Sequence, residues 1–292
     1  MRRGPITLCV ILTVGLVACG SPRAQRAEQR EEISPLAAAA TASQKAGAVR
    51  VVMHGTQELE GFDEPSRMSG FGVIDPATER MQFVMEMGET PLGDLGTMEI
   101  VGDGLVMYMK SSFFNSLGPM PTPWLKMDLD AIGEKMGFDM SALMEAGGGH
   151  DPSQMIDFLH GAADVEEVGR ATVHGYETTH YRTVVDLRDA AAAAPPEIRD
   201  RVASSVDRLI ELSGESSYPM DVWVDDANLV RRMKYVMDYT EVDPSLGMPP
   251  MKMTDTTDFM EYGIRARIKP PRPSQVTDLL ELIEETEDSA AY

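Results

Sequence analysis

Short segments in which apolar and polar residues alternate follow one another along much of this chain, and they constrain its fold more than any other feature. In residues 80–87, for example, apolar side chains occupy every second position, with Gln82 and Glu86 on the opposite side. Such alternation is typical of β-strands with one buried face, and Asp, Gly and Pro at the breaks indicate antiparallel connections. We expect strands in the ranges 49–60, 68–75, 80–87, 97–101, 105–110, 124–129, 165–186, 220–224, 229–241 and 252–264.

Helical patterns interrupt the predicted strands in two places, at 129–160 and at 196–212. The clearest is 196–212, where an apolar stripe recurs at helical spacing and Gly214 follows the end. Shorter helices are predicted at 129–136, 140–146 and 151–160. Strands, then helices, then strands again predict an α+β domain: a large, strongly curved antiparallel sheet with helices on one side.

The N-terminus has the pattern of an export signal that ends at Cys19. Arg2 and Arg3 precede an apolar run from 6 to 18, which is too short for a lasting membrane span of about 20 residues. The sequence Leu-Val-Ala-Cys at 16–19 resembles the lipobox of bacterial lipoproteins, in which the cysteine becomes the acylated first residue of the mature chain. An ordinary secretory signal is the alternative. We therefore expect residues 1–18 to be removed and Cys19 to hold the protein at the extracytoplasmic face of the cell membrane.

Composition divides the rest of the chain into three parts. Residues 19–47 are rich in Arg, Glu, Gln, Ser and Ala, without a sustained pattern, and are interpreted as a flexible stalk in which 36–48 can form a short helix. Residues 48–269 are interpreted as the folded domain. Residues 270–292 are interpreted as a proline-rich break followed by an acidic tail.

The net charge of −21 excludes one class of partner. Nucleic-acid binding requires clustered Lys and Arg, so a chain this acidic is not expected to bind it, and the same charge predicts repulsion from anionic lipid surfaces. The membrane anchor is then expected to come from acyl chains. Because Cys9 leaves with the signal, the mature domain has no disulfide and depends on its core for stability.

Catalytic motifs are not found in the sequence. It has no nucleophile elbow and no glycine-rich phosphate loop, and His174 and His180 lack the spacing of a metal site. Asp225 and Asp226 are interpreted as turn residues. We predict a non-enzymatic protein without a metal or cofactor.

Methionine is the compositional outlier, with 22 residues against eight Phe and two Trp. Several Met residues fall on one face of their predicted strands, and methionine adapts to ligands of irregular shape. These faces can pack as a closed core or line an apolar cavity, and periodicity does not separate the two. The candidate cavity residues are Met81, Phe83, Met85, Met87, Leu105, Met107, Met109, Met233, Tyr235 and Met237.

Several sequence fragments, together with the lipobox and stalk, resemble actinobacterial lipoproteins of the LppX/LprG type. The fragments are Trp-Leu-Lys-Met-Asp-Leu at 124–129, Asp-Pro at 151–152, Val-Glu-Glu-Val-Gly at 165–169, Gly-Tyr-Glu-Thr-Thr-His-Tyr-Arg at 175–182 and Met-Asp-Val-Trp-Val-Asp at 220–225.

The resemblance implies the LolA/LolB-like carrier fold, a half-barrel with helices on its concave side and a lipid-sized cavity between. It also implies binding of acylated lipid or lipoglycan, movement of that lipid in the cell envelope, and a possible envelope transporter as partner. The alternative is a non-catalytic interaction or sensory lipoprotein with a filled core and no lipid cargo.

Overall fold

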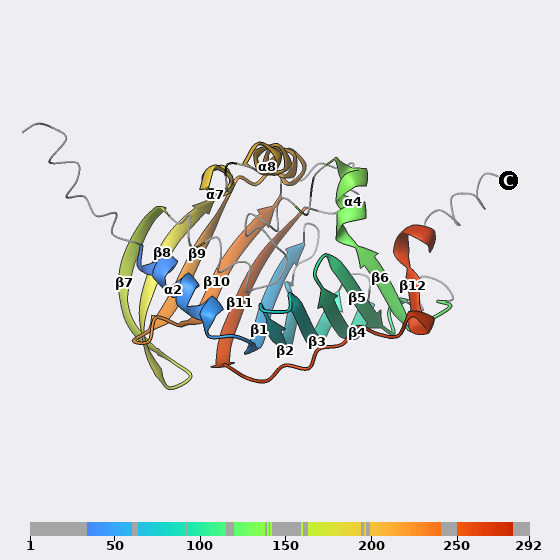
Figure 1. Ribbon diagram of the computed structural model, residues 1–292, viewed down its shortest axis with the longest axis horizontal. Helices are drawn as coiled ribbons and strands as arrows, with labels where there is room; N and C mark the ends of the chain where they lie inside the picture. Colours follow the sequence, from blue (N-terminus) through green and yellow to red (C-terminus); the bar gives the residue numbers. More distant parts are fainter. Residues whose placement is uncertain are drawn as a thin grey trace, which may run out of the picture. The chain divides into compact units, whose positions relative to one another are not determined.

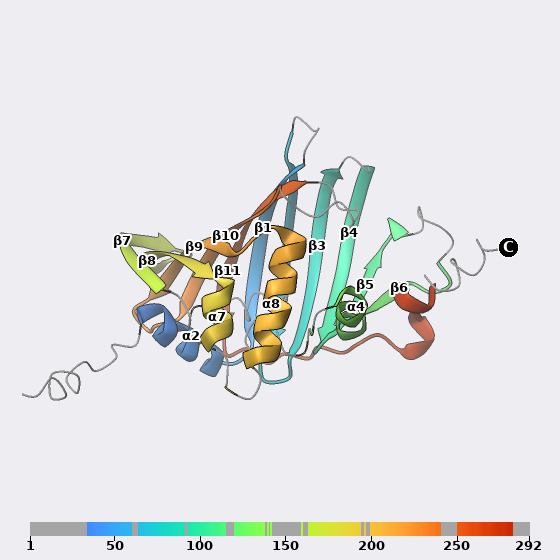
Figure 2. The same cartoon turned by 90° about the horizontal axis from the view of Figure 1, so that it is seen from above.

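The computed structural model describes residues 34–59, 64–90, 93–114, 120–137, 163–193, 199–240 and 250–282, together with positions 139, 141, 159 and 196. These residues form one curved, unclosed sheet accompanied by helices (Figures 1 and 2), which confirms the predicted α+β class. The predicted signal peptide, Cys19 and most of the predicted helices at 140–146 and 151–160 lie outside the described residues.

The sheet has twelve strands in the order β12-β6-β5-β4-β3-β2-β1-β11-β10-β9-β8-β7. Their bounds are β1 (Val49–Leu59), β2 (Ser66–Asp75), β3 (Arg80–Thr90), β4 (Gly93–Asp103), β5 (Val106–Ser111), β6 (Trp124–Asp128), β7 (Ala163–Val173), β8 (Tyr176–Asp186), β9 (Ser217–Asp225), β10 (Val230–Tyr239), β11 (Met251–Tyr262) and β12 (Val276–Asp278). The strands predicted by alternation are thus present, and the predicted range 165–186 is divided at His174 and Gly175 into β7 and β8.

Two antiparallel meanders make up most of the sheet. Strands β1 to β6 form the first and β7 to β11 form the second, each with chain neighbours as sheet neighbours. The meanders are joined at the centre by antiparallel pairing of β1 with β11, where Gly55 lies opposite Asp255. This central pair is the contact that makes one sheet out of two sequence-local halves.

Local signals explain the helix boundaries. Helix α4 (Leu129–Met136) has the bounds predicted from sequence: Asp128 Oδ1 accepts a hydrogen bond from the Ala131 amide at 3.3 Å, and Gly137 ends the helix with φ of 87°. Helix α8 (Arg199–Ser213) corresponds to the predicted helix at 196–212. Helix α7 (Leu187–Ala193) was not predicted.

Helix α2 (Pro35–Lys45) corresponds to the short helix considered at 36–48, but it packs in the core, which was not expected of a stalk at 19–47. Its Leu36, Ala39 and Ala40 are fully buried and belong to the main core together with residues of β9 and β10. Alanine lets a helix approach a sheet closely, but it leaves little amphipathic signal in the sequence. The packed part of the chain therefore includes residues well before 48.

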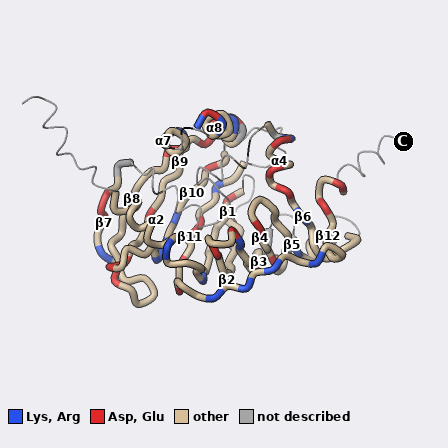
Figure 3. The backbone as a smooth tube through the Cα atoms, viewed as in Figure 1, with Lys and Arg blue, Asp and Glu red and all other residues tan. Residues whose placement is uncertain are grey.

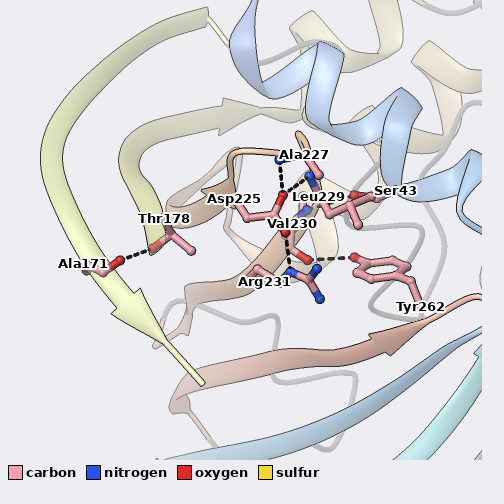
Figure 4. A network of polar contacts seen from close by, with 9 residues as sticks. All are labelled: Ser43, Ala171, Thr178, Asp225, Ala227, Leu229, Val230, Arg231 and Tyr262. Carbon is pink, nitrogen blue, oxygen red and sulfur yellow. Dashed lines mark hydrogen bonds and ion pairs between the residues drawn. The ribbon is translucent and has the colours of Figure 1, made fainter. Parts of the chain in front are cut away.

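The turn between β9 and β10 is built around Asp225 (Figure 4). Its Oδ1 accepts hydrogen bonds from the amides of Ala227 at 2.8 Å and Leu229 at 2.9 Å. Its Oδ2 accepts from Arg231 Nε at 2.7 Å, in an ion pair that is almost completely buried. The interpretation of Asp225 as a turn residue is confirmed.

The same turn holds α2 against the sheet (Figure 4). The Val230 amide donates to Ser43 Oγ of α2 at 2.9 Å, and the Tyr262 hydroxyl donates to the Val230 carbonyl at 2.7 Å. The Arg231 guanidinium lies 3.6 Å from the centre of the Tyr176 ring, a cation–π contact. Helix α2, β8, β10 and β11 are thereby connected through one polar cluster, whose Asp225–Arg231 ion pair is buried.

The first part of the predicted acidic tail joins the sheet. Strand β12 pairs in parallel with β6, and Lys126 Nζ lies 2.9 Å from Asp278 Oδ2 across this pair. The hydroxyl oxygens of Thr122 and Thr277 are 2.6 Å apart. These contacts place residues 276–278 at one edge of the sheet, with β7 at the other.

One face of the sheet carries the helices. Tyr218, Met220 and Val222 alternate along β9 and therefore point to the same side. Tyr218 packs in a cluster with residues of α7 and α8, while Met220 and Val222 pack in the cluster that includes α2. We call this side the helix-covered face and the opposite side the polar face; Figure 2 shows α2, α7 and α8 on the same side of the sheet.

Candidate functional site

The strand register places the predicted apolar stripes of β3, β5 and β10 on the helix-covered face. Met85 of β3 lies opposite Gly70, Gly70 opposite Met53, Met53 opposite Thr257, and Thr257 opposite Met233 of β10. On the other flank, the register through β4 brings the β5 residues to the same side. Met107 lies opposite Gly102, which pairs with Met81, and Met109 lies opposite Ile100, which pairs with Phe83.

The candidate residues differ in how far they are buried. Phe83, Met233 and Tyr235 belong to the buried core, and Met81, Met85 and Met237 are partly exposed and pack against it. Met87, Leu105, Met107 and Met109 are half-buried. The face is thus filled over β9 and β10 and remains partly open over β3 to β5.

Helices α7 and α8 contact both flanks of the sheet. Their cluster, which contains Val202 and Val206, has Met237 of β10 and Leu105 of the β4–β5 turn packed against it. Strands β11, β1, β2, β3 and β4 lie between β10 and β5 in the sheet. One helical cluster therefore meets side chains that are five strands apart on the sheet.

Glycines form the floor of the partly open region. Gly72, Gly70 and Gly102 lie opposite Phe83, Met85 and Met81, respectively. A Cβ atom at Gly72 would lie 2.4 Å from Phe83 Cδ1, and one at Gly102 would lie 2.8 Å from Met81 Cγ. The large side chains of β3 therefore lean across the glycines of β2 and β4 and leave a low apolar surface.

Two polar side chains of β11 lie on this apolar face, and the sequence analysis did not single them out. Asp255 is 5% exposed, and burial raises the pKa of its carboxyl group to about 6. Thr257 is 1% exposed, and its Oγ1 has no hydrogen-bond partner among the described residues. Along β11 these two residues alternate in step with Met251, Met253 and Phe259. The sequence alone could therefore have placed all five side chains on the same face.

The polar face carries paired charges. Asp258 accepts bonds from Arg232 at 2.5 and 2.7 Å, and His174 Nε2 lies 2.6 Å from its Oδ2. Burial acts to raise the pKa of Asp258, but the hydrogen bonds from Arg232 and His174 outweigh it and hold that pKa below its usual range. Arg232 and Asp258 thus form an ion pair within the sheet.

The second predicted histidine, His180, also contacts a carboxylate. Its ring stacks on Trp223 with centroids 4.2 Å apart, and its Nε2 lies 2.7 Å from Asp221 Oδ1. Within the described ranges, no group of three His, Cys, Asp or Glu side chains is placed to hold a metal ion. No helix in the described part of the chain is both long and apolar enough to cross a membrane.

Comparison with known proteins gives matches in structure but not in sequence. No family model matches the chain, and no curated protein matches it. Similar solved structures include the Mycobacterium tuberculosis lipoprotein LppX, at 12% identity and a TM-score of 0.45, covering 80% of this chain and 98% of that chain. LprF from Mycobacterium bovis matches at 16% identity and a TM-score of 0.41, covering 86% and 98%. A LolA superfamily protein from Nitrosomonas europaea matches at 10% identity and a TM-score of 0.27, covering 80% and 93%.

These neighbours are of the kind that the sequence resemblance named. LppX, LprF and a LolA superfamily protein are thus among the similar solved structures, at low sequence identity.

Proposed function

We propose that this protein is a lipoprotein of the extracytoplasmic membrane face that binds an acylated lipid or lipoglycan over β3 to β5 and carries or presents it in the cell envelope. Cys19 provides the anchor in this proposal. The lining residues are the candidates of β3 to β5, which are Met81, Phe83, Met85, Met87, Leu105, Met107 and Met109, together with the glycines of the floor, while Met233, Tyr235 and Met237 of β10 border this region. An envelope transporter is a possible partner in the transfer. No catalytic residue is assigned.

One observation carries the proposal: a low, half-buried Met and Gly surface lies on the face that α7 and α8 cover. Because Leu105 and Met237 meet the same helical cluster across five intervening strands, we take this face to be the concave side of the sheet. The apolar floor would then lie beneath the helices, with the cargo between.

Energetics explain why such a floor suits an acyl chain. Each methylene removed from water contributes about 0.8 kcal/mol, so a chain of about sixteen carbons needs roughly 12 kcal/mol of apolar shelter. Methionine side chains supply that shelter and adjust to a bent chain, because they are unbranched and polarisable. The glycines add depth at Gly70, Gly72 and Gly102.

The burial of Met233 and Tyr235 favours a second candidate, an envelope interaction protein with a filled core. In that case the half-buried residues over β3 to β5 would form an apolar surface for a protein partner. The two candidates differ in whether lipid remains bound after purification.

The unacylated mature chain is expected to retain acylated lipid when it is purified from a host that makes the natural cargo. Native mass spectrometry detects the added mass, and a fluorescent fatty acyl probe measures uptake by the emptied protein. A chain free of lipid that also takes up no probe would favour the filled-core candidate.

Gly102→Val provides the matched variant for that measurement. The added side chain displaces Met81 toward the proposed cargo, since the nearest atoms to a Cβ at Gly102 all belong to Met81. Probe affinity should fall about tenfold, because roughly two methylene groups of space are lost. Thr97→Val, an exposed position on the polar face of the same strand, is the control and should bind as before.

Cys19→Ser is expected to leave the protein unprocessed or to release it from membranes, because serine cannot form the thioether to the lipid. Membrane fractionation and the mass of the product measure this. Full membrane association with normal processing in the variant would exclude the lipobox, without bearing on lipid binding by the domain.

A further inference from the structure

A basic strip crosses one end of the sheet in an otherwise acidic protein. We define the basic strip as Arg265, Arg267, Lys269 and Arg272, which lie between β11 and β12. No Asp or Glu occurs between Glu261 and Asp278, although the whole chain has a net charge of −21. Figure 3 shows blue positions along this segment, beneath the ends of the first meander.

The backbone of this segment directs the cations to solvent. Residues 264–272 form neither helix nor strand. Alternate residues differ in burial: Arg265, Arg267 and Lys269 are exposed, whereas Ile268 is buried. The Ile264 amide donates to the Ala48 carbonyl at 3.2 Å, which fixes the start of the segment beside the α2–β1 connection. The strip is therefore held by its apolar residues and presents its charges outward.

The strip carries free positive charge. No ion pair of its four cations is found among the described residues, in contrast to Arg50, whose Nε lies 3.7 Å from Glu261 Oε2. A groove of about 400 Å³ runs beside the strip and is lined by Arg50, Arg265 and Arg267, with Glu261 as its carboxylate. Exposed cations without partners gain the most from an anionic surface.

The net charge of the protein does not cancel this local charge. At physiological ionic strength, charges more than about 8 to 10 Å apart are largely screened from one another. Alternate residues of an extended chain are about 7 Å apart, so neighbouring cations of the strip act together. The repulsion from anionic lipid expected from total charge thus does not extend to this end of the sheet.

We propose that the basic strip docks the domain on an anionic phospholipid surface, with this end of the sheet toward the bilayer. An anionic lipid surface is complementary in charge to the strip. This inference rests in part on the proposed anchor at Cys19, which would keep such a surface within reach. Docking would fix the orientation of a domain that the tether alone leaves free to turn. Each basic residue near an anionic surface strengthens binding several-fold.

Vesicle co-sedimentation of the full mature chain with Cys19→Ser tests this proposal without an acyl anchor. We expect binding to vesicles of phosphatidylcholine with about one third phosphatidylglycerol, and little binding to phosphatidylcholine alone. The variant R265Q/R267Q should bind the anionic vesicles about thirtyfold more weakly. The variant R265K/R267K should bind like the parent, since surface attraction depends on charge. Circular dichroism and thermal melting confirm the fold of each variant.

The control R67Q/K234Q removes the same charge from two exposed cations elsewhere on the sheet and should leave binding unchanged. Equal loss in this control, equal binding to neutral vesicles, or no binding to anionic vesicles at low and physiological salt would each overturn the proposal. Binding that appears only after residues 283–292 are removed would indicate that the strip binds the acidic end of the chain itself. That result would also overturn the proposal. Lipid copurification is independent of all these outcomes.

Discussion

Replacing Arg231 with alanine should lower the free energy of unfolding by about 3 kcal/mol, because it leaves a buried carboxylate without its cation. Asp225 would keep the amide hydrogen bonds from Ala227 and Leu229, but its Oδ2 would lose the 2.7 Å bond from Arg231. The cation–π contact with Tyr176 would be lost as well. Urea unfolding followed by circular dichroism measures the change.

Arg170→Ala is the matched control for this substitution. Arg170 pairs at 3.1 Å with Asp226, the neighbour of Asp225 in the same turn, but the two side chains are 59% and 80% exposed. A solvated ion pair of this kind contributes little, so the loss should stay within about 0.5 kcal/mol. If both variants lose the same stability, the buried pair does not hold the α2 connection in the way the geometry indicates.

Replacing Asp255 with asparagine should raise the free energy of unfolding at pH 7.5 by about 3 kcal/mol. The folded-state pKa of about 6 exceeds the ordinary value of 3.8, so the folded protein binds this proton more tightly than the unfolded chain does. The free energy of unfolding of the parent should therefore fall as pH rises from about 4 to 6, and then level off with respect to this group. The variant lacks this loss, so the free energies of unfolding of the variant and the parent should converge near pH 4.

Asp258→Asn, three residues further along β11, should change the free energy of unfolding in the opposite direction. The pKa of Asp258 is held low by Arg232 and His174, so its charged form stabilises the fold above the ordinary pKa. Its replacement should destabilise the protein at neutral pH, and the difference should shrink as pH falls below 4. Urea titrations at about pH 7.5, 6, 4 and 3 compare both variants with the parent. Equal pH dependence of the parent and Asp255→Asn would show that Asp255 is not the responsible group.

Most strands could be predicted because their signals are local. Alternation identifies one buried face, and turn residues such as Asp225 identify the connection to the next strand. The pairing of β1 with β11 could not be predicted in this way, because no local signal links residue 55 with residue 255. The three residues of β12 were missed for a related reason: a strand that short has no detectable period.

The candidate site was only partly accessible to sequence reasoning. Alternation assigned Met85 and Met233 to faces, but only the register showed that the two faces are one. The role of Gly70 and Gly72 emerges only from the large side chains opposite them. Asp255 was missed because an acidic residue in an alternating segment is ordinarily assigned to the solvent side.

The central pairing of β1 with β11 also has a consequence for biogenesis. The first meander emerges from the ribosome early, but the outer edge of β1 has no partner until residues 251–262 have been synthesised. Contacts so distant in sequence form slowly, because a long loop must close first. We expect the nascent chain to stay incompletely folded until its synthesis is nearly finished. Such late folding is compatible with the proposed export, in which the chain would cross the membrane unfolded.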